Sequence, residues 1–187
     1  MAKSTQAKAM ANPKKSGAKP KKAARPAVDG DILAREKAAR DLIYRSCLAL
    51  DDMDFTAYLA LCHADFRYVI STYSPELRKD IIWLDHDKAA MTTLFDVLPS
   101  HASDNLLRLD LSRHLTVYTI DDDGKQASAV SSLQVYTTTL DGGITELLGV
   151  AKYFDTIAFD KKEPLLLSRE VRLKTRMLGE TGSHIPF

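Results

Sequence analysis

The sequence is poor in the residues that build disulfide scaffolds and metal knuckles. Its 187 residues include 2 Cys, 1 Trp and 5 His. Cys47 and Cys62 are too few for a disulfide framework and too far apart for a metal knuckle. Their apolar helical surroundings predict buried, reduced thiols in a cytoplasmic protein. No run of about 18 apolar residues occurs, which excludes a membrane-spanning helix.

The common signatures of catalysis are also missing. The chain has no P-loop, no glycine-rich dinucleotide-binding turn and no Gly-x-Ser-x-Gly nucleophile elbow. The histidines are scattered and form no pair at metal-binding spacing. Asp85-His86-Asp87 is the most suggestive group, but a mononuclear iron site needs two histidines and a carboxylate that converge. These three residues fit the start of a helix better, with an aspartate as N-cap.

Charge is divided unevenly along the chain. Residues 1–30 carry eight Lys/Arg and one acidic residue, a net charge of +7, whereas the rest of the chain has 18 basic and 24 acidic residues, a net charge of −6. The first segment holds three prolines and almost no β-branched aliphatic residues, so burial of apolar surface cannot offset the entropy lost on ordering. We therefore expect a disordered basic tail over residues 1–30 and one folded domain over residues 31–187.

The composition of the basic tail favours a solubilising role. It has no apolar core of a secretory signal, and its lysines outnumber its arginines, unlike those of a transit peptide. Without aromatic residues to stack on bases, its attraction to nucleic acid would be independent of base sequence. We expect neither a nucleic-acid partner nor a membrane partner.

Helical periodicity comes first along the domain. Apolar residues recur every three or four positions between residues 39 and 50, and Asp54 can cap a second helix whose apolar face includes Phe55 and Cys62. Residues 66–70 then predict a strand, residues 74–76 a turn and residues 81–84 a short extended piece. Asp85 is expected to start a third helix, which Pro99 ends.

Extended runs follow over residues 106–108, 113–120, 127–139, 144–159 and 165–177, separated by turn-forming sequences. The last run alternates between an apolar and a charged side, and only Arg169 and Thr175 interrupt the apolar side. Such alternation is typical of an antiparallel sheet covered on one face. Strands this long need a bend, which Gly149 can supply. Helices followed by long strands predict an α+β domain, an NTF2-like (cystatin-like) cone with N-terminal helices packed on a curved, mostly antiparallel sheet.

Two kinds of site are compatible with these residues. Phe66, Tyr68, Tyr73 and Trp83 lie within 18 residues of one another beside basic residues, a composition that suits a protein interface. Core packing is the ordinary explanation for Phe66 and Tyr68. The residues expected to contact a partner are therefore Tyr73, Trp83, Arg172 and Arg176.

The alternative is a stand-alone isomerase or dehydratase, since cone folds of this class also hold small enzymes with an Asp/His pair. Asp51 or Asp52 would pair with His63 or His86, and burial would raise the pKa of the carboxyl group into the range of a general base. Acidic residues between two helices are more often solvated caps, so this hypothesis ranks second.

From about Ala38 onward the chain resembles the small (β) subunit of Rieske-type, aromatic-ring-hydroxylating oxygenases. The resemblance rests on residues 48–55 with Tyr58-Leu59, and on residues 64–68, 149–155, 167–173 and 185–187. Residues 68–87 look most like those of the branch that hydroxylates methanesulfonate. One departure is Lys174, which replaces the acidic residue usual after the final leucine.

The resemblance implies a subunit without active-site residues: no catalytic, cofactor-binding or metal-binding residue is expected. A large (α) subunit would carry a Rieske [2Fe–2S] cluster and a mononuclear Fe(II), a separate reductase would supply electrons from NADH, and the small subunits would join in an α3β3 assembly. The sequence agrees, because the cysteines and histidines of this chain cannot supply a Rieske ligand set.

Overall fold

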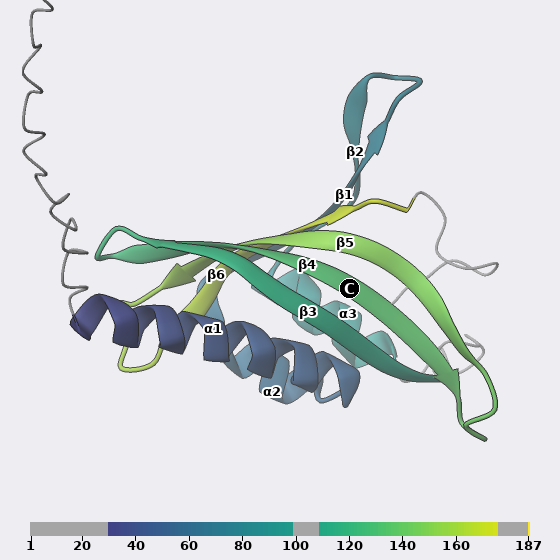
Figure 1. The fold of residues 1–187 in the computed structure, drawn as a ribbon, viewed down its shortest axis with the longest axis horizontal. Helices are drawn as coiled ribbons and strands as arrows, with labels where there is room; N and C mark the ends of the chain where they lie inside the picture. The colour runs from purple at the N-terminus through teal and green to yellow at the C-terminus, as the bar shows by residue number, and fades with distance from the viewer. Residues whose placement is uncertain (1–29, 99–108, 176–186) are drawn as a thin grey trace, which may run out of the picture.

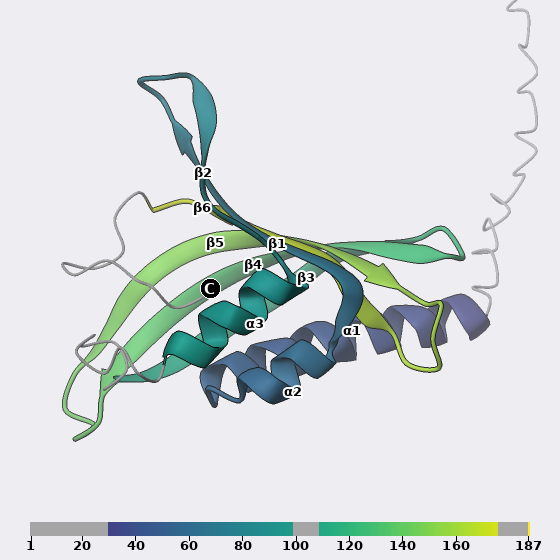
Figure 2. The same ribbon diagram turned by 180° about the vertical axis from the view of Figure 1, so that it is seen from behind.

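A computed structural model describes residues 30–98, 109–175 and 187. Within these residues three helices pack against one side of a curved six-stranded sheet (Figures 1 and 2). The α+β class is therefore confirmed. Some predictions fall outside the described residues: most of the predicted tail, Pro99, residues 106–108, Arg176 and Met177. The division into a tail and a domain therefore stays a prediction.

Aspartate side chains cap the N-terminal ends of the second and third helices. Helix α1 (Gly30–Asp51) is followed by Met53, which has a positive φ of 53°, and then by α2 (Phe55–Ala60). As expected, Asp54 caps α2, because its carboxylate accepts the Ala57 N–H at 2.9 Å. Helix α3 (Lys88–Val97) is capped by Asp87, whose carboxylate accepts the Ala90 N–H at 2.8 Å.

The third helix therefore starts later than the sequence suggested. Asp85 and His86 belong to strand β2 (Lys79–Asp87) and only Asp87 caps the helix. The short extended piece predicted over residues 81–84 is a full strand, which forms a hairpin with β1 (Cys62–Ser74). Cys62 begins this strand instead of lying on the face of α2. The sequence pattern predicted only the apolar middle of β2, because the ends of this edge strand carry charged side chains, which edge strands tolerate.

The remaining strands are β3 (Leu109–Asp122), β4 (Gln126–Thr139), β5 (Thr145–Ala158) and β6 (Leu165–Leu173). The sheet order is β2-β1-β6-β5-β4-β3, and only β1 and β6 run parallel. The expected bend near Gly149 is present as a register shift, since Val135 pairs with Gly149 and Tyr136 pairs with Leu147. The concave side of the bent sheet faces the helices (Figure 1).

Ion pairs fix both ends of α1 to β3. Near its start, Arg35 makes two hydrogen bonds to Asp122, at 2.5 and 2.8 Å, and its guanidinium lies 3.9 Å from the centre of the Phe159 ring. The Arg35 guanidinium lowers the pKa of the Asp122 carboxyl group. At the end of α1, Asp51 pairs with Arg113 of β3. The helix therefore lies along the sheet and closes the concave side.

Candidate partner interface

The β1–β2 hairpin projects from the body of the molecule (Figures 1 and 2). It exposes four large apolar side chains, which together form the hairpin patch: Tyr73 (53% exposed), Leu77 (60%), Ile82 (54%) and Trp83 (43%). Exposed aromatic and aliphatic residues grouped on one projecting element are typical of a protein interface. Tyr73 and Trp83, predicted as partner contacts, are thus exposed side by side with Leu77 and Ile82, which the sequence analysis did not single out.

Strand pairing explains how the hairpin patch arises. Ile82 pairs with Ser71 and Leu84 pairs with Ile70, so Trp83 is the additional residue of a bulge. A bulge twists an edge strand and keeps it from pairing further. Ile70 lies in the core, whereas Trp83 stays exposed, so packing inside the domain does not account for the single tryptophan.

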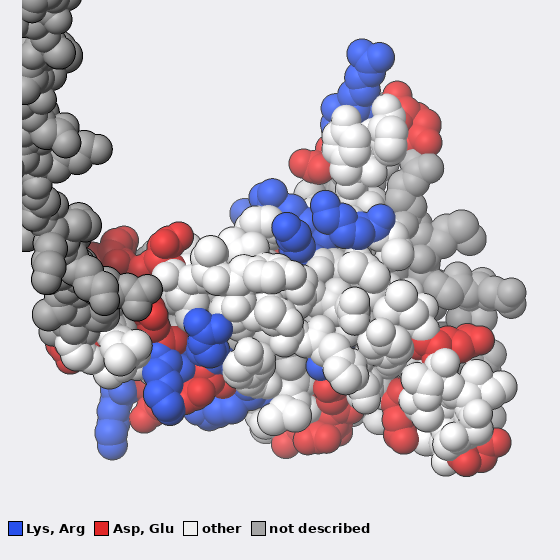
Figure 3. Space-filling model, in the orientation of Figure 1, with Lys and Arg blue, Asp and Glu red and all other residues white. Residues whose placement is uncertain are grey.

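Arg172 lies on the outer face of the sheet, away from the helices. It pairs with Ser71 of β1 and Lys152 of β5 in the register of the sheet, and its side chain is 52% exposed. Its guanidinium makes two hydrogen bonds to Glu170 and lies 4.1 Å from the centre of the Phe154 ring. Lys and Arg side chains gather on this face below the hairpin (Figure 3).

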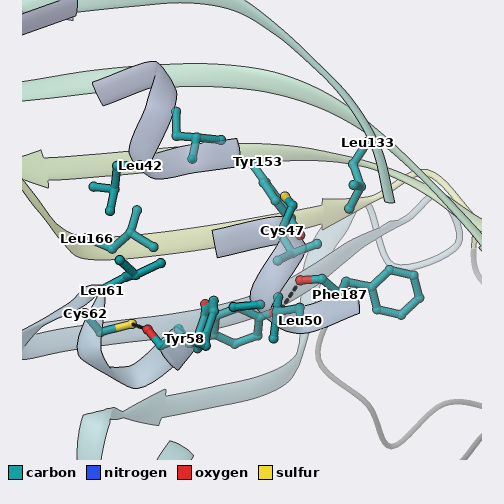
Figure 4. Close-up of a cluster of buried hydrophobic side chains, with 14 of the residues drawn as sticks. Leu42, Cys47, Leu50, Tyr58, Leu61, Cys62, Leu133, Tyr153, Leu166 and Phe187 are labelled. Atoms are coloured by element: carbon teal, nitrogen blue, oxygen red, sulfur yellow. Dashed lines mark hydrogen bonds between the residues drawn. The ribbon is translucent and has the colours of Figure 1, made fainter. Parts of the chain in front are cut away.

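Buried side chains of the described residues pack together on the concave side of the sheet, between the sheet and the helices. Figure 4 shows Tyr58, Tyr153, Leu50, Leu133 and Phe187 converging between α1, α2 and the sheet. Phe187 is only 2% exposed, and its carbonyl oxygen accepts a hydrogen bond of 2.6 Å from the Tyr68 hydroxyl. Burial raises the pKa of the Tyr68 hydroxyl above its ordinary value, so the group remains a neutral donor at neutral pH.

A buried ion pair crosses this interior. Arg169 of β6 donates two hydrogen bonds, at 2.8 and 2.9 Å, to Asp155 of β5, and both side chains are 0% exposed. The guanidinium of Arg169 lies 4.0 Å from the centre of the Tyr153 ring. Sequence alternation treated Arg169 as an interruption of the apolar face; the structure shows that it points into the core with that face.

The candidate Asp/His pairs do not form. Asp51 bonds to Arg113, and Asp52 is exposed at the end of α1. His63 lies 3.4 Å from Asp160 and 3.6 Å from Asp65, both on the surface, and His86 contacts the backbone carbonyl of Asp85. The structure thus places neither histidine beside Asp51 or Asp52.

Among the described residues, a surface pocket of about 410 Å³ lies at the base of the hairpin. Its lining includes Arg67, Asp85 and Lys88, but these groups already have partners: Arg67 bonds to Asp85 at 2.8 Å and Lys88 to the Cys62 carbonyl at 2.7 Å. The described part of the chain contains no group of three or more His, Cys, Asp or Glu residues that could hold a metal ion. Cys47 and Cys62 are free and buried, as expected, and burial raises the pKa of the Cys62 thiol to about 12.

Comparison with known proteins decides between the two hypotheses. No protein-family model matches the chain. It is 37% identical over 159 residues to the methanesulfonate monooxygenase hydroxylase subunit beta of Methylosulfonomonas methylovora, covering 80% of this chain and 86% of that protein. The chain belongs to the β-subunit family of ring-hydroxylating oxygenases. It is also 28% identical over 148 residues to the 2-aminobenzenesulfonate 2,3-dioxygenase subunit beta of an Alcaligenes species, covering 79% and 95% of the two chains.

Solved structures share the fold of this β subunit. A β subunit from Novosphingobium aromaticivorans, assigned to an aromatic-ring-hydroxylating dioxygenase, matches with a TM-score of 0.67 and 19% identity over 84% of this chain and 99% of that one. An NTF2-like protein with a cystatin-like fold from the same organism matches with a TM-score of 0.61 and 19% identity over 84% and 92% of the chains. The predicted NTF2-like cone is therefore confirmed.

The predicted role as an oxygenase β subunit is confirmed by the family, and the stand-alone isomerase or dehydratase is not favoured. As for membrane association, none of the described helices is long and apolar enough to cross a bilayer. The interface residues Tyr73, Trp83 and Arg172 stay a prediction, and Arg176 lies outside the described residues.

Proposed function

We propose that this β subunit is a non-catalytic scaffold of a cytoplasmic, multicomponent Rieske non-haem iron oxygenase that hydroxylates a sulfonate. A large (α) subunit would carry the [2Fe–2S] cluster and the mononuclear Fe(II), and a separate reductase would supply electrons from NADH. The observation that supports this proposal most is the 37% identity to a hydroxylase β subunit over most of both chains. The side chains of Tyr58, Tyr153, Arg169 and Phe187 are buried together in the core, which agrees with a structural role for them.

Methanesulfonate is the proposed substrate of the assembled enzyme. Both curated relatives carry a sulfonate in their names, and the methanesulfonate enzyme is the more similar of the two, at 37% against 28% identity. The α subunit would bind this substrate, so the β subunit would contribute stability and assembly. An α3β3 stoichiometry is proposed for the complex.

Co-purification tests this function. The β subunit is expressed alone and together with a large (α) subunit from the same source organism. Mass, iron content and NADH oxidation are measured with methanesulfonate and with 2-aminobenzenesulfonate. We expect the β subunit alone to hold no stoichiometric iron, and the complex to hold equimolar subunits with iron and sulfonate-dependent turnover. Tightly bound iron or turnover in the isolated β subunit would contradict the proposal.

The hairpin patch is the proposed contact with the large subunit. Replacing Tyr73 and Trp83 together by Asp is expected to weaken the α–β complex by more than about tenfold, because buried aromatic residues dominate binding energy at interfaces. Affinity is measured by titrating labelled β subunit with the large subunit. Tyr118→Asp is the matched control, since Tyr118 is 60% exposed on β3 at the opposite edge of the sheet. Equal affinity of the double variant and the control would exclude the hairpin as the contact.

A further inference from the structure

Three cationic residues lie together on the outer side of the sheet, one on β5, one on β6 and one directly after β6. Lys152 of β5 pairs directly with Arg172 of β6, and the backbone N–H of Lys174 donates to the Val150 carbonyl at 2.8 Å, which places Lys174 one step further on the same side. Directly opposed residues of antiparallel strands have Cβ atoms about 5 Å apart. We call Lys152, Arg172 and Lys174 the basic face.

Among the described residues, two carboxylates, Glu170 and Asp80, act on Arg172 and raise the pKa of its guanidinium. Glu170 is engaged by Arg172 through bonds of 2.8 and 2.9 Å, and it also accepts a hydrogen bond from Ser71. The Arg172 guanidinium lowers the pKa of the Glu170 carboxyl group. Within residues 30–98 and 109–175, Lys152 and Lys174 have no carboxylate in ion-pair contact. The basic face is thus a local cluster of positive charge on a domain whose residues 31–187 carry a net charge of −6.

Like charges directly opposite each other on two strands destabilise a sheet. The repulsion between Lys152 and Arg172 is therefore a cost to the isolated domain, which a carboxylate placed between them from outside would relieve. The local chemistry consequently fits an acidic ligand.

The surroundings of the basic face suit a protein better than a nucleic acid. Ser71 of β1 pairs with Arg172 of β6 on one side and with Ile82 of β2 on the other, so the three residues lie in one row across the sheet. Tyr73, two residues further along β1, points to the same side. Tyr73 and Ile82 are 53% and 54% exposed, so apolar surface borders the cations. Aromatic residues and arginine beside apolar surface are the composition of protein interfaces.

We propose that the basic face binds an acidic segment of the large subunit, one that places Asp or Glu side chains between Lys152, Arg172 and Lys174 while its apolar residues contact Tyr73 and Ile82. This proposal rests on the proposed function, and it adds the chemistry of the partner segment. The hairpin patch and the basic face then form one continuous surface, in which the apolar part supplies affinity and the cations set orientation and association rate.

Charge reversal tests the basic face. The variant Lys152→Glu/Lys174→Glu is compared with Lys125→Glu/Lys162→Glu, which makes the same change of charge at two exposed turn lysines. Binding of the large subunit is titrated at about 50 and about 500 mM NaCl, a range over which surface electrostatics is screened. We expect the first variant to bind more than about tenfold more weakly at low salt and to lose most of the salt dependence, and the control to bind within about twofold of the wild type.

The outcomes separate this inference from the proposed function. If the wild-type β subunit fails to bind the large subunit, the proposed function fails and this inference fails with it. If the wild type binds and both variants match it in affinity and salt dependence, only the basic face is excluded. Binding of single-stranded DNA is measured for the same proteins. If Lys152→Glu/Lys174→Glu loses DNA binding but binds the large subunit like the wild type, the inference is also overturned. Thermal unfolding of the isolated variants checks the fold, and relief of the Lys152–Arg172 repulsion predicts no loss of stability.

Discussion

Asp155→Ala is expected to lower the free energy of unfolding by about 3–5 kcal/mol, because it would leave the Arg169 guanidinium buried without its counter-ion. Although burial opposes its charge, the Asp155 carboxylate raises the pKa of Arg169 well above the ordinary value, so the guanidinium stays charged at neutral pH. The two hydrogen bonds between these side chains would be lost together. Urea unfolding followed by circular dichroism measures the change.

Two further variants show that the effect comes from the buried charge. Asp41→Ala breaks the exposed pair between Lys37 and Asp41 and should leave the unfolding midpoint nearly unchanged. The paired replacement Asp155→Leu/Arg169→Met removes both charges and should recover most of the stability that Asp155→Ala loses. If Asp155→Ala fails to fold, the folding of the paired variant still tests the argument. Unfolding of Asp155→Ala at the wild-type urea concentration would contradict it.

The Arg169–Asp155 pair also shows where prediction from the sequence stops. The long strands and the α+β class followed from alternation and turn composition, and the structure confirms them. Alternation assumes one residue per step, however, and pairing between β5 and β6 shifts at Thr156/Ile157. The shift turns Leu166 fully into the core and leaves Leu165 and Leu167 half-buried. The register that joins residues 155 and 169 depends on this shift and on contacts distant in sequence, so no local pattern encodes it.

For a similar reason, the sequence pointed to only part of the exposed apolar surface of the hairpin. Tyr73 and Trp83 are aromatic residues of the kind that is common in interfaces. Leu77 and Ile82 are ordinary core residue types, and only the projection of the hairpin explains their exposure. The basic face needs the register as well, because Lys152 and Arg172 are twenty residues apart and become neighbours only through β5–β6 pairing. The sequence shows which side chains are basic or apolar, whereas only the fold shows which of them become neighbours on adjacent strands.

Asp51→Ala is expected to destabilise the protein by roughly 3 kcal/mol, because this carboxylate fixes the end of α1 to β3. One oxygen of Asp51 accepts the Arg113 backbone N–H at 3.0 Å, and the other accepts its guanidinium at 2.5 Å. The Arg113 side chain is 1% exposed, so water cannot replace the lost carboxylate easily. Urea unfolding of the isolated β subunit measures the effect.

Asp52→Ala is the matched control for Asp51→Ala, since Asp52 is the adjacent carboxylate and is exposed. We expect it to leave both stability and the turnover of the assembled oxygenase unchanged. Asp51→Ala should reduce the yield of complex while turnover per assembled complex stays at the wild-type value, because Asp51 acts through helix placement and not through proton transfer. A stable Asp51→Ala complex with greatly reduced turnover would instead assign a catalytic role to this carboxylate and revive the Asp/His hypothesis.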